Sequence, residues 1–164
     1  MILVLVSGPV PLASPITWNV VDDHEYVKDP FFDDNPRAVM ENKQFNSVPT
    51  MIGVNKQEGL LFTSIFYALE ENLKFLQDNW EMCVVSNFIG KFFLDKPFDE
   101  KIKDKVKKIT EFYFGDQKID MNTFENLTNL YTDPGFLYGT DVLARYLQLL
   151  DLRIIYTYVL TTYP

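Results

Sequence analysis

The segment Val48-Pro-Thr-Met-Ile-Gly-Val-Asn55 is a short apolar run rich in β-branched residues, and Lys56-Gln57-Glu58-Gly59 follows it directly. A run of this length between a proline and polar residues is typical of a strand that is buried on both faces. In open α/β sheets, active sites lie at the carboxyl ends of strands. Glu58 is therefore a candidate functional carboxylate, and Gly59 lets the backbone turn into the next helix. The alternative is that Glu58 only caps that helix.

Most of the remaining pattern is helical. Asn35-Pro36 combines an N-cap residue with a proline at the first helical position. Residues 99–114 form the clearest helix, because apolar residues recur every three or four positions and Gly115 ends the pattern. Thr132-Asp133-Pro134-Gly135 has turn chemistry and is expected to separate two helices. Further helices are predicted at about 60–68, 70–80, 82–93, 121–130 and 139–150, a short extended piece at 18–21, and a second strand at 154–162.

The predicted strands are few and far apart in the sequence. About two strands do not make a stable sheet, and nothing else in the sequence covers their edges. We therefore expect an α/β protein that is mostly helical, in which residues 1–164 form a single partial domain of a larger whole.

Composition excludes several classes of partner. With 23 acidic against 15 basic residues, the chain carries a formal net charge of -8, so no nucleic-acid partner is expected. No run approaches the roughly 18 apolar residues of a membrane helix, and the apolar start lacks basic residues, so neither a membrane span nor a signal peptide is predicted. The single cysteine, Cys83, excludes an internal disulfide and is expected to be a buried thiol.

Few residues could carry chemistry. The chain has no G-x-S-x-G, no G-x-G-x-x-G, no phosphate loop and no H-E-x-x-H. Its one histidine, His24, stands in an acidic stretch and is expected at the surface, so neither a metal site nor a cofactor is predicted. Ser47, Ser64 and Ser86 lack the sharp turn that exposes a catalytic serine.

The segment around Glu58 closely resembles one found in type-B carboxylesterases, the family that includes cholinesterases and insect juvenile hormone esterases. The matching residues are Asn46-Ser-Val-Pro-Thr-Met-Ile-Gly-Val-Asn-Lys-Gln-Glu-Gly59. The resemblance extends in order and spacing over about residues 18–163, is strongest to insect members, and implies an incomplete piece of an α/β-hydrolase fold. Its other landmarks are Trp18-Asn-Val-Val-Asp22, Asp29-Pro-Phe-Phe-Asp-Asp-Asn-Pro36, Tyr131-Thr-Asp-Pro-Gly-Phe136 and Ile155-Tyr-Thr-Tyr-Val159.

The resemblance also implies roles for particular residues. In the family, the glutamate before the glycine is the acid of a Ser-Glu-His triad, so Glu58 would hydrogen-bond a histidine and hold its tautomer. The family order is serine, acid, histidine, which puts the serine before this chain and the histidine after it. Leu61, Phe62 and Ile65 match residues that line the substrate gorge, and two of them are aliphatic, which favours an apolar or neutral ester over a choline ester. Simple core packing is the alternative for these three.

The leading hypothesis is a fragment of a serine carboxylic-ester hydrolase, inactive alone, whose partner in the complete protein is a small-molecule ester. A non-catalytic esterase-like adhesion or binding module is the alternative. An independently folded product agrees poorly with the aromatic content of 15% and the uncovered strand edges, which predict aggregation. The family resemblance implies secretion, and Asn126-Leu-Thr128 is a candidate glycosylation sequon if its helix face is exposed.

Overall fold

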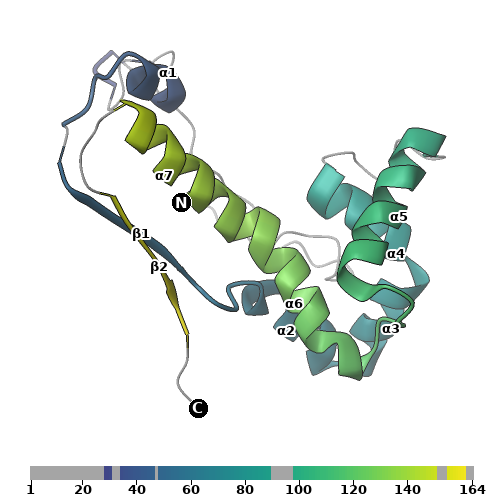
Figure 1. The fold of residues 1–164 in the computed structure, drawn as a ribbon. Coiled ribbons are helices and arrows are strands. Elements are labelled where there is room, and N and C mark those ends of the chain that lie inside the picture. The colour runs from purple at the N-terminus through teal and green to yellow at the C-terminus, as the bar shows by residue number, and fades with distance from the viewer. Residues whose placement is uncertain (1–27, 31–33, 47, 90–97, 151–154, 162–164) are drawn as a thin grey trace.

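The computed structural model describes residues 28–30, 34–46, 48–89, 98–150 and 155–161 (Figure 1). His24, Ser47 and the extended piece expected at 18–21 lie outside these residues. In the described part of the chain, a helical region and a two-stranded sheet are joined by the turn after the first strand.

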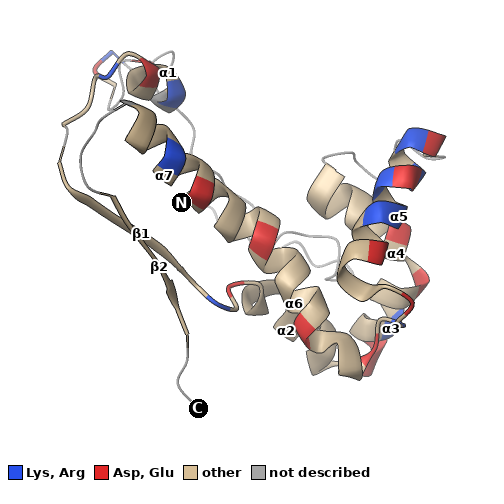
Figure 2. Ribbon diagram, viewed as in Figure 1, with Lys and Arg blue, Asp and Glu red and all other residues tan. Residues whose placement is uncertain are grey.

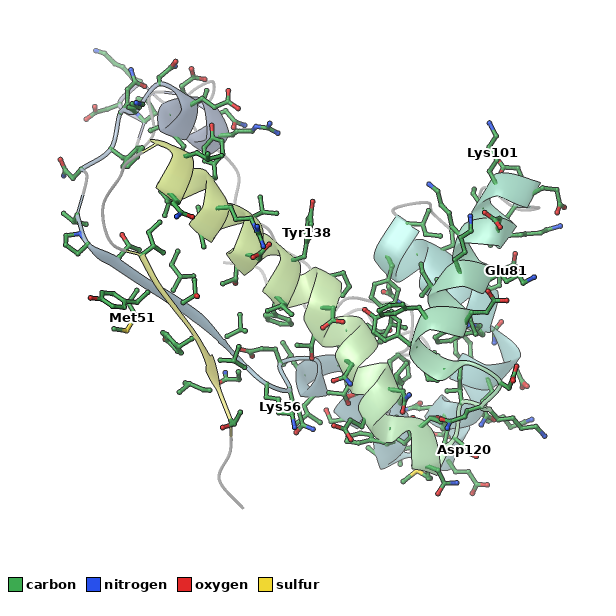
Figure 3. The ribbon with its side chains drawn as sticks, viewed as in Figure 1. Met51, Lys56, Glu81, Lys101, Asp120 and Tyr138 are labelled. Atoms are coloured by element: carbon green, nitrogen blue, oxygen red, sulfur yellow. The ribbon has the colours of Figure 1, made fainter. Side chains whose placement is uncertain are left out.

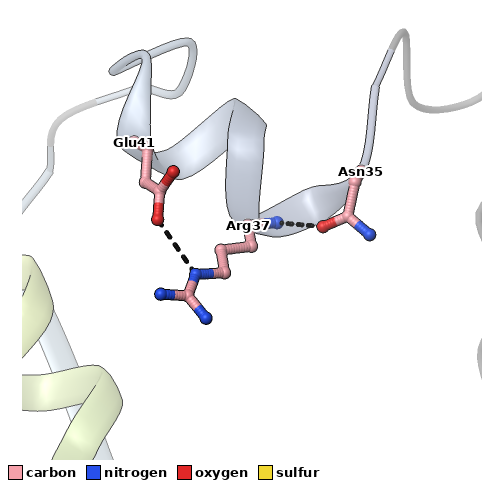
Figure 4. A network of polar contacts seen from close by, with 3 residues as sticks. All are labelled: Asn35, Arg37 and Glu41. Atoms are coloured by element: carbon pink, nitrogen blue, oxygen red, sulfur yellow. Dashed lines mark hydrogen bonds and ion pairs between the residues drawn. The ribbon is translucent and has the colours of Figure 1, made fainter.

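The first helix, α1 (Pro36–Glu41), begins where the sequence predicts. The Asn35 side chain accepts a hydrogen bond from the Arg37 amide at 2.9 Å, which satisfies one of the unpaired donors at the helix start. Arg37 Nε also donates to Oε1 of Glu41, one turn further along the helix, at 2.9 Å (Figure 4). The Asn-Pro start signal is confirmed.

Both predicted strands are present, and they pair with each other. Strand β1 (Thr50–Asn55) runs parallel to β2 (Ile155–Leu160), with Thr50 opposite Ile155 and Asn55 opposite Leu160. Helix α7 packs against both strands. Five of the six residues of β2 are exposed.

The helices between the strands form the rest of the described chain. The stretch expected at 70–80 divides at Asn79, and the stretch expected at 82–93 becomes a short helix that continues as a π-helical turn through Ile89. In order, the elements are α2 (Leu60–Ala68), α3 (Glu70–Asp78), α4 (Trp80–Val84), the π-helical turn η1 (Val85–Ile89), α5 (Glu100–Phe114), the 3₁₀ turn η3 (Met121–Thr123), α6 (Phe124–Thr132), the π-helical turn η4 (Asp133–Leu137) and α7 (Tyr138–Leu150).

The turn predicted at Thr132 to Gly135 is wrong. Helix α6, η4 and α7 follow one another without a break, and Pro134 lies in the first turn of η4. The Tyr138 amide bonds to the Asp133 carbonyl, five residues back, so the regular hydrogen-bond ladder shifts at this point. A proline, which has no N–H to give, is tolerated where the ladder is already interrupted.

The core lies among the helices, and Cys83 is in it, as predicted, with 1% of its surface exposed. On α5, Ile102 and Val106 are buried. Basic and acidic residues follow one another along this helix (Figure 2). Lysines pair with carboxylates one turn away, such as Lys108 Nζ with Asp104 Oδ2 at 2.7 Å. The amphipathic reading of this helix is confirmed. The main cluster contains Phe66, Leu76, Cys83, Phe114, Leu127, Leu130 and Tyr131.

Candidate functional site

Glu58 lies in the turn between β1 and α2, where the sheet meets the helices. Figure 3 shows Lys56, two residues earlier, at this junction. The Glu58 side chain is half-buried. Both features agree with a carboxylate placed at the carboxyl end of a strand.

The two oxygens of the Glu58 carboxylate have different surroundings. Oε1 accepts from the backbone N–H of Asn55 at 2.9 Å and from Nδ2 of the same residue at 2.8 Å. Oε2 accepts no hydrogen bond from the residues that the structure describes. One oxygen is therefore held against the strand end, and the other has capacity for a further donor.

Gly59, the next residue, is buried against α6. Its N–H donates to Thr132 Oγ1 at 2.9 Å. A Cβ at this position would overlap the carbonyl oxygen of Thr128. The glycine therefore allows a close approach of two backbones, and this approach fixes the residue that follows Glu58.

A buried threonine network ties the start of α2 to α6. Thr63 Oγ1 lies 3.0 Å from Thr128 Oγ1, and Thr132 Oγ1 donates to the Thr128 carbonyl at 2.8 Å. Exposure of the three side chains is between 0% and 4%, so each hydroxyl needs these partners. This network was not predicted from the residue order. Its only local signal is the four-residue spacing of Thr128 and Thr132, which suits hydroxyls that bond back to the preceding turn.

Parallel pairing brings the carboxyl ends of both strands to the same end of the sheet. The Lys56 N–H donates to the Leu160 carbonyl at 2.8 Å, so the pairing extends to the first residue of the Glu58 turn. The carboxyl end of β2 therefore lies at the end of the sheet where Glu58 lies.

The residues predicted to line a substrate pocket differ in exposure. Leu61 is 52% exposed, and Ile65 is half-buried. Phe62 stacks on Tyr131, with ring centroids 5.3 Å apart, and packs against the main core cluster. These contacts favour the core-packing alternative for Phe62, whereas Leu61 remains accessible beside Glu58.

Three other candidate residues, Ser64, Ser86 and Asn126, lie on helical elements of the described chain. Ser64 is exposed, and Ser86 Oγ is buried without a hydrogen-bond partner among the described residues. Asn126 is half-buried, and its Nδ2 donates to the Tyr113 carbonyl at 2.6 Å.

A separate cavity of about 690 Å³ lies between α5 and the continuous α6–α7 helix. Ile109 and Leu130 are among its apolar lining residues. Tyr113 Oη donates to Asp133 Oδ2 at 2.8 Å in its wall. Burial raises the pKa of Tyr113 above its ordinary value, and so do the hydrogen bond to Asp133 and the charge of that carboxylate.

Within the described ranges, no group of His, Cys, Asp and Glu side chains could hold a metal ion. In the same ranges, no helix has the length and apolar character that crossing a membrane requires.

Comparison with known proteins places this arrangement in a family. The chain is 30% identical to esterase E4 of Myzus persicae over 114 residues, which are 69% of the chain and 20% of that protein. It is 30% identical to a carboxylic ester hydrolase of Bombus ignitus over 139 residues (82% of the chain, 23% of the relative), and 28% identical to juvenile hormone esterase of Tribolium castaneum over 114 residues (67% and 19%). The chain thus spans about a fifth of the length of the curated relatives it matches.

The family model of the carboxylesterases matches residues 14–163. A mostly helical structure with two parallel strands is consistent with part of the α/β-hydrolase fold that this family implies. Because the match extends over most of the sequence and confirms the resemblance seen around Glu58, the chain belongs to the carboxylesterase family.

Proposed function

We propose that this chain is part of a serine carboxylic-ester hydrolase and supplies Glu58 as the acid of its catalytic triad. The position of the Glu58 carboxylate carries this proposal: it lies just beyond the carboxyl end of a parallel strand, with Oε1 held by Asn55 and Oε2 directed to no described donor. A triad acid needs this combination of a fixed orientation and an available acceptor.

In the proposed mechanism, Glu58 Oε2 accepts the Nδ1–H of a histidine. That hydrogen bond selects the tautomer in which Nε2 is a base, so the histidine can take the proton of a serine hydroxyl as the serine attacks an ester carbonyl. The negative charge of Glu58 then stabilises the imidazolium. Glu58 itself neither attacks the ester nor becomes protonated.

The histidine would come from residues that follow β2. The Leu160 carbonyl accepts the Lys56 N–H, so a segment that continues from β2 starts at the end of the sheet where Glu58 lies. His24 precedes Glu58 in the sequence, and Ser64 and Ser86 have no G-x-S-x-G around them. In this proposal the serine and the histidine both belong to parts of the esterase beyond these 164 residues.

The substrate we propose is an apolar or neutral carboxylic ester. Leu61 is accessible beside Glu58, and Ile65 lies one helical turn further along α2. Aliphatic side chains offer no aromatic face to a quaternary ammonium group, so a choline ester would gain little here.

Two measurements test the proposal. The 164-residue chain, mixed with an aryl acetate and with an organophosphate probe, should show no turnover and no serine adduct, because loss of the serine or histidine of a triad costs about a millionfold in kcat. In the full-length protein, expressed with the coding sequence on both sides of these residues, Glu58→Gln should lower kcat about 10⁴-fold.

Glu125→Gln is the matched control in the full-length protein, because Glu125 is an exposed carboxylate on α6. It should leave turnover within about twofold, as expected for a surface change. Wild-type activity in the Glu58→Gln protein, or a full-length sequence without the serine and histidine, would refute the proposed function. The second result would favour a binding module instead.

A further inference from the structure

Asn55 is the last residue of β1, and both of its nitrogen donors bond to the same oxygen of Glu58. The backbone N–H lies 2.9 Å from Oε1, and Nδ2 lies 2.8 Å from it. Bonds from neutral donors to a carboxylate are charge-assisted and stronger than ordinary ones. The pair therefore acts as a two-point clamp on a single oxygen.

The clamp matters because the last torsion of a glutamate side chain is soft. Rotation about this sp³–sp² bond has a broad, roughly two-fold profile, so an unrestrained carboxylate turns and exchanges its two oxygens. Two donors on Oε1 select one orientation. Oε2 then keeps a defined direction for its own hydrogen bond.

The backbone half of the clamp does not compete with the sheet. The Lys56 N–H bonds to Leu160 in β2, and successive N–H groups of a strand point toward opposite edges. The Asn55 N–H therefore points away from β2, where Glu58 Oε1 satisfies it. Strand pairing and carboxylate orientation use different donors of the same short segment.

We propose that Asn55 is a positioning residue for the triad acid: its amide side chain fixes which oxygen of Glu58 faces the histidine. This inference rests on the proposed role of Glu58 and extends it to a residue with no part in the triad. Asn55 acts only through Glu58. Its loss should therefore lower kcat without changing the affinity for the ester.

The test uses the full-length protein with an aryl acetate as substrate. Asn55→Ala removes the Nδ2 donor and keeps the backbone donor, and we expect kcat to fall about tenfold with KM within about twofold. Asn55→Asp places a second carboxylate against Glu58, and we expect about a hundredfold loss of kcat, because like charges repel at this distance. Asn55 is exposed, so thermal melting should show that both variants remain folded.

Lys56→Ala is the matched control, since Lys56 is the adjacent exposed residue and contributes its backbone to the pairing with β2. It should leave kcat unchanged. In the Glu58→Gln background, Asn55→Ala should cause no further loss, because the residue acts through Glu58. A merely structural role would instead give an additive loss with a lowered melting temperature.

The outcomes separate two failures. If Glu58→Gln abolishes turnover but both Asn55 variants keep wild-type kcat, or if their losses add to that of Glu58→Gln, the positioning role is overturned and the proposed function stands. If Glu58→Gln retains wild-type turnover, the proposed function fails, and the role of Asn55 fails with it.

Discussion

The helical region and the sheet differ in how much of their apolar side chains is exposed to solvent. Leu76, Val84 and Leu127 of the helices are fully buried, whereas Met51 of β1 is 70% exposed and Tyr156 of β2 is 57% exposed. Parallel strands are normally covered on both faces, but here α7 is the helix that packs on both strands in the described part of the chain. The helices thus enclose a core of their own, whereas most side chains of the described strands are exposed. Glu58 lies at the junction of the two.

The contrast predicts very different costs for the same truncation in the two regions. Leu127→Ala should lower the free energy of unfolding by about 2–5 kcal/mol, because it leaves a cavity in a closed core. Leu160→Ala, at a residue that is 58% exposed in β2, should cost less than about 0.5 kcal/mol. Urea unfolding monitored by circular dichroism compares them, and equal costs would mean that the sheet is as well packed as the helices.

The contact between α2 and α6 should tolerate no extra atoms. Gly59→Ala would place a methyl group on the Thr128 carbonyl and should cost about 3 kcal/mol. Gly135→Ala is the control: a Cβ there meets no atom within 4 Å, so the change should be neutral or slightly stabilising. Thermal melting of the two variants measures both effects. A neutral Gly59→Ala would show that contact with α6 does not fix the turn after Glu58.

The threonine network should matter for its hydroxyls as well as its volume. Thr132→Val keeps the shape of the side chain but leaves the Gly59 N–H without its acceptor, at a cost of about 1–2 kcal/mol. Thr157→Val, on exposed β2, should change the unfolding free energy by less than about 0.5 kcal/mol. Denaturant midpoints measure both, and a stabilising Thr132→Val would contradict the hydrogen-bonding role.

The smallest expected change in the free energy of unfolding comes from the ionisation of Tyr113 at alkaline pH. Burial and the neighbouring Asp133 raise the pKa of Tyr113 in the folded chain. Above about pH 10 the unfolded chain therefore loses the Tyr113 proton before the folded chain does. The free energy of unfolding then falls as pH rises. Below that pH this group contributes no pH dependence. Tyr113→Phe should make the alkaline loss shallower in unfolding measurements between about pH 8 and pH 11. An unchanged slope would mean that Tyr113 ionises equally in both states.

Local signals in the sequence predicted the elements they directly control. Asp99 accepts the Ile102 amide at 2.8 Å and starts α5, and Gly115, at φ 58°, follows its end, as the pattern indicates. The β-branched runs became β1 and β2 for the same reason. Their parallel pairing could not be predicted from either run alone, because it depends on how the intervening helices fold back.

The predictions that failed, and the contacts that were not predicted, depend on three-dimensional geometry that the residue order does not show. Thr132 to Gly135 has the composition of a turn, but the π-helical turn there accommodates Pro134 and the helix continues. The candidate site could be predicted because a strand, an acid and a glycine are adjacent in sequence at Glu58 and the surrounding segment resembles one of type-B carboxylesterases. Its hydrogen bonds to Asn55 depend on the geometry of the turn, and the burial of Thr63 depends on contact with α6, so neither was visible in the residue order.

A crystal structure of the full-length protein tests the central claim most directly, through the distance between Glu58 Oε2 and the nearest histidine. We predict that a histidine Nδ1 lies about 2.6–3.2 Å from Oε2 while Oε1 stays bonded to Asn55. A Glu58 carboxylate turned to solvent, or a catalytic histidine oriented by a different carboxylate, would contradict the account.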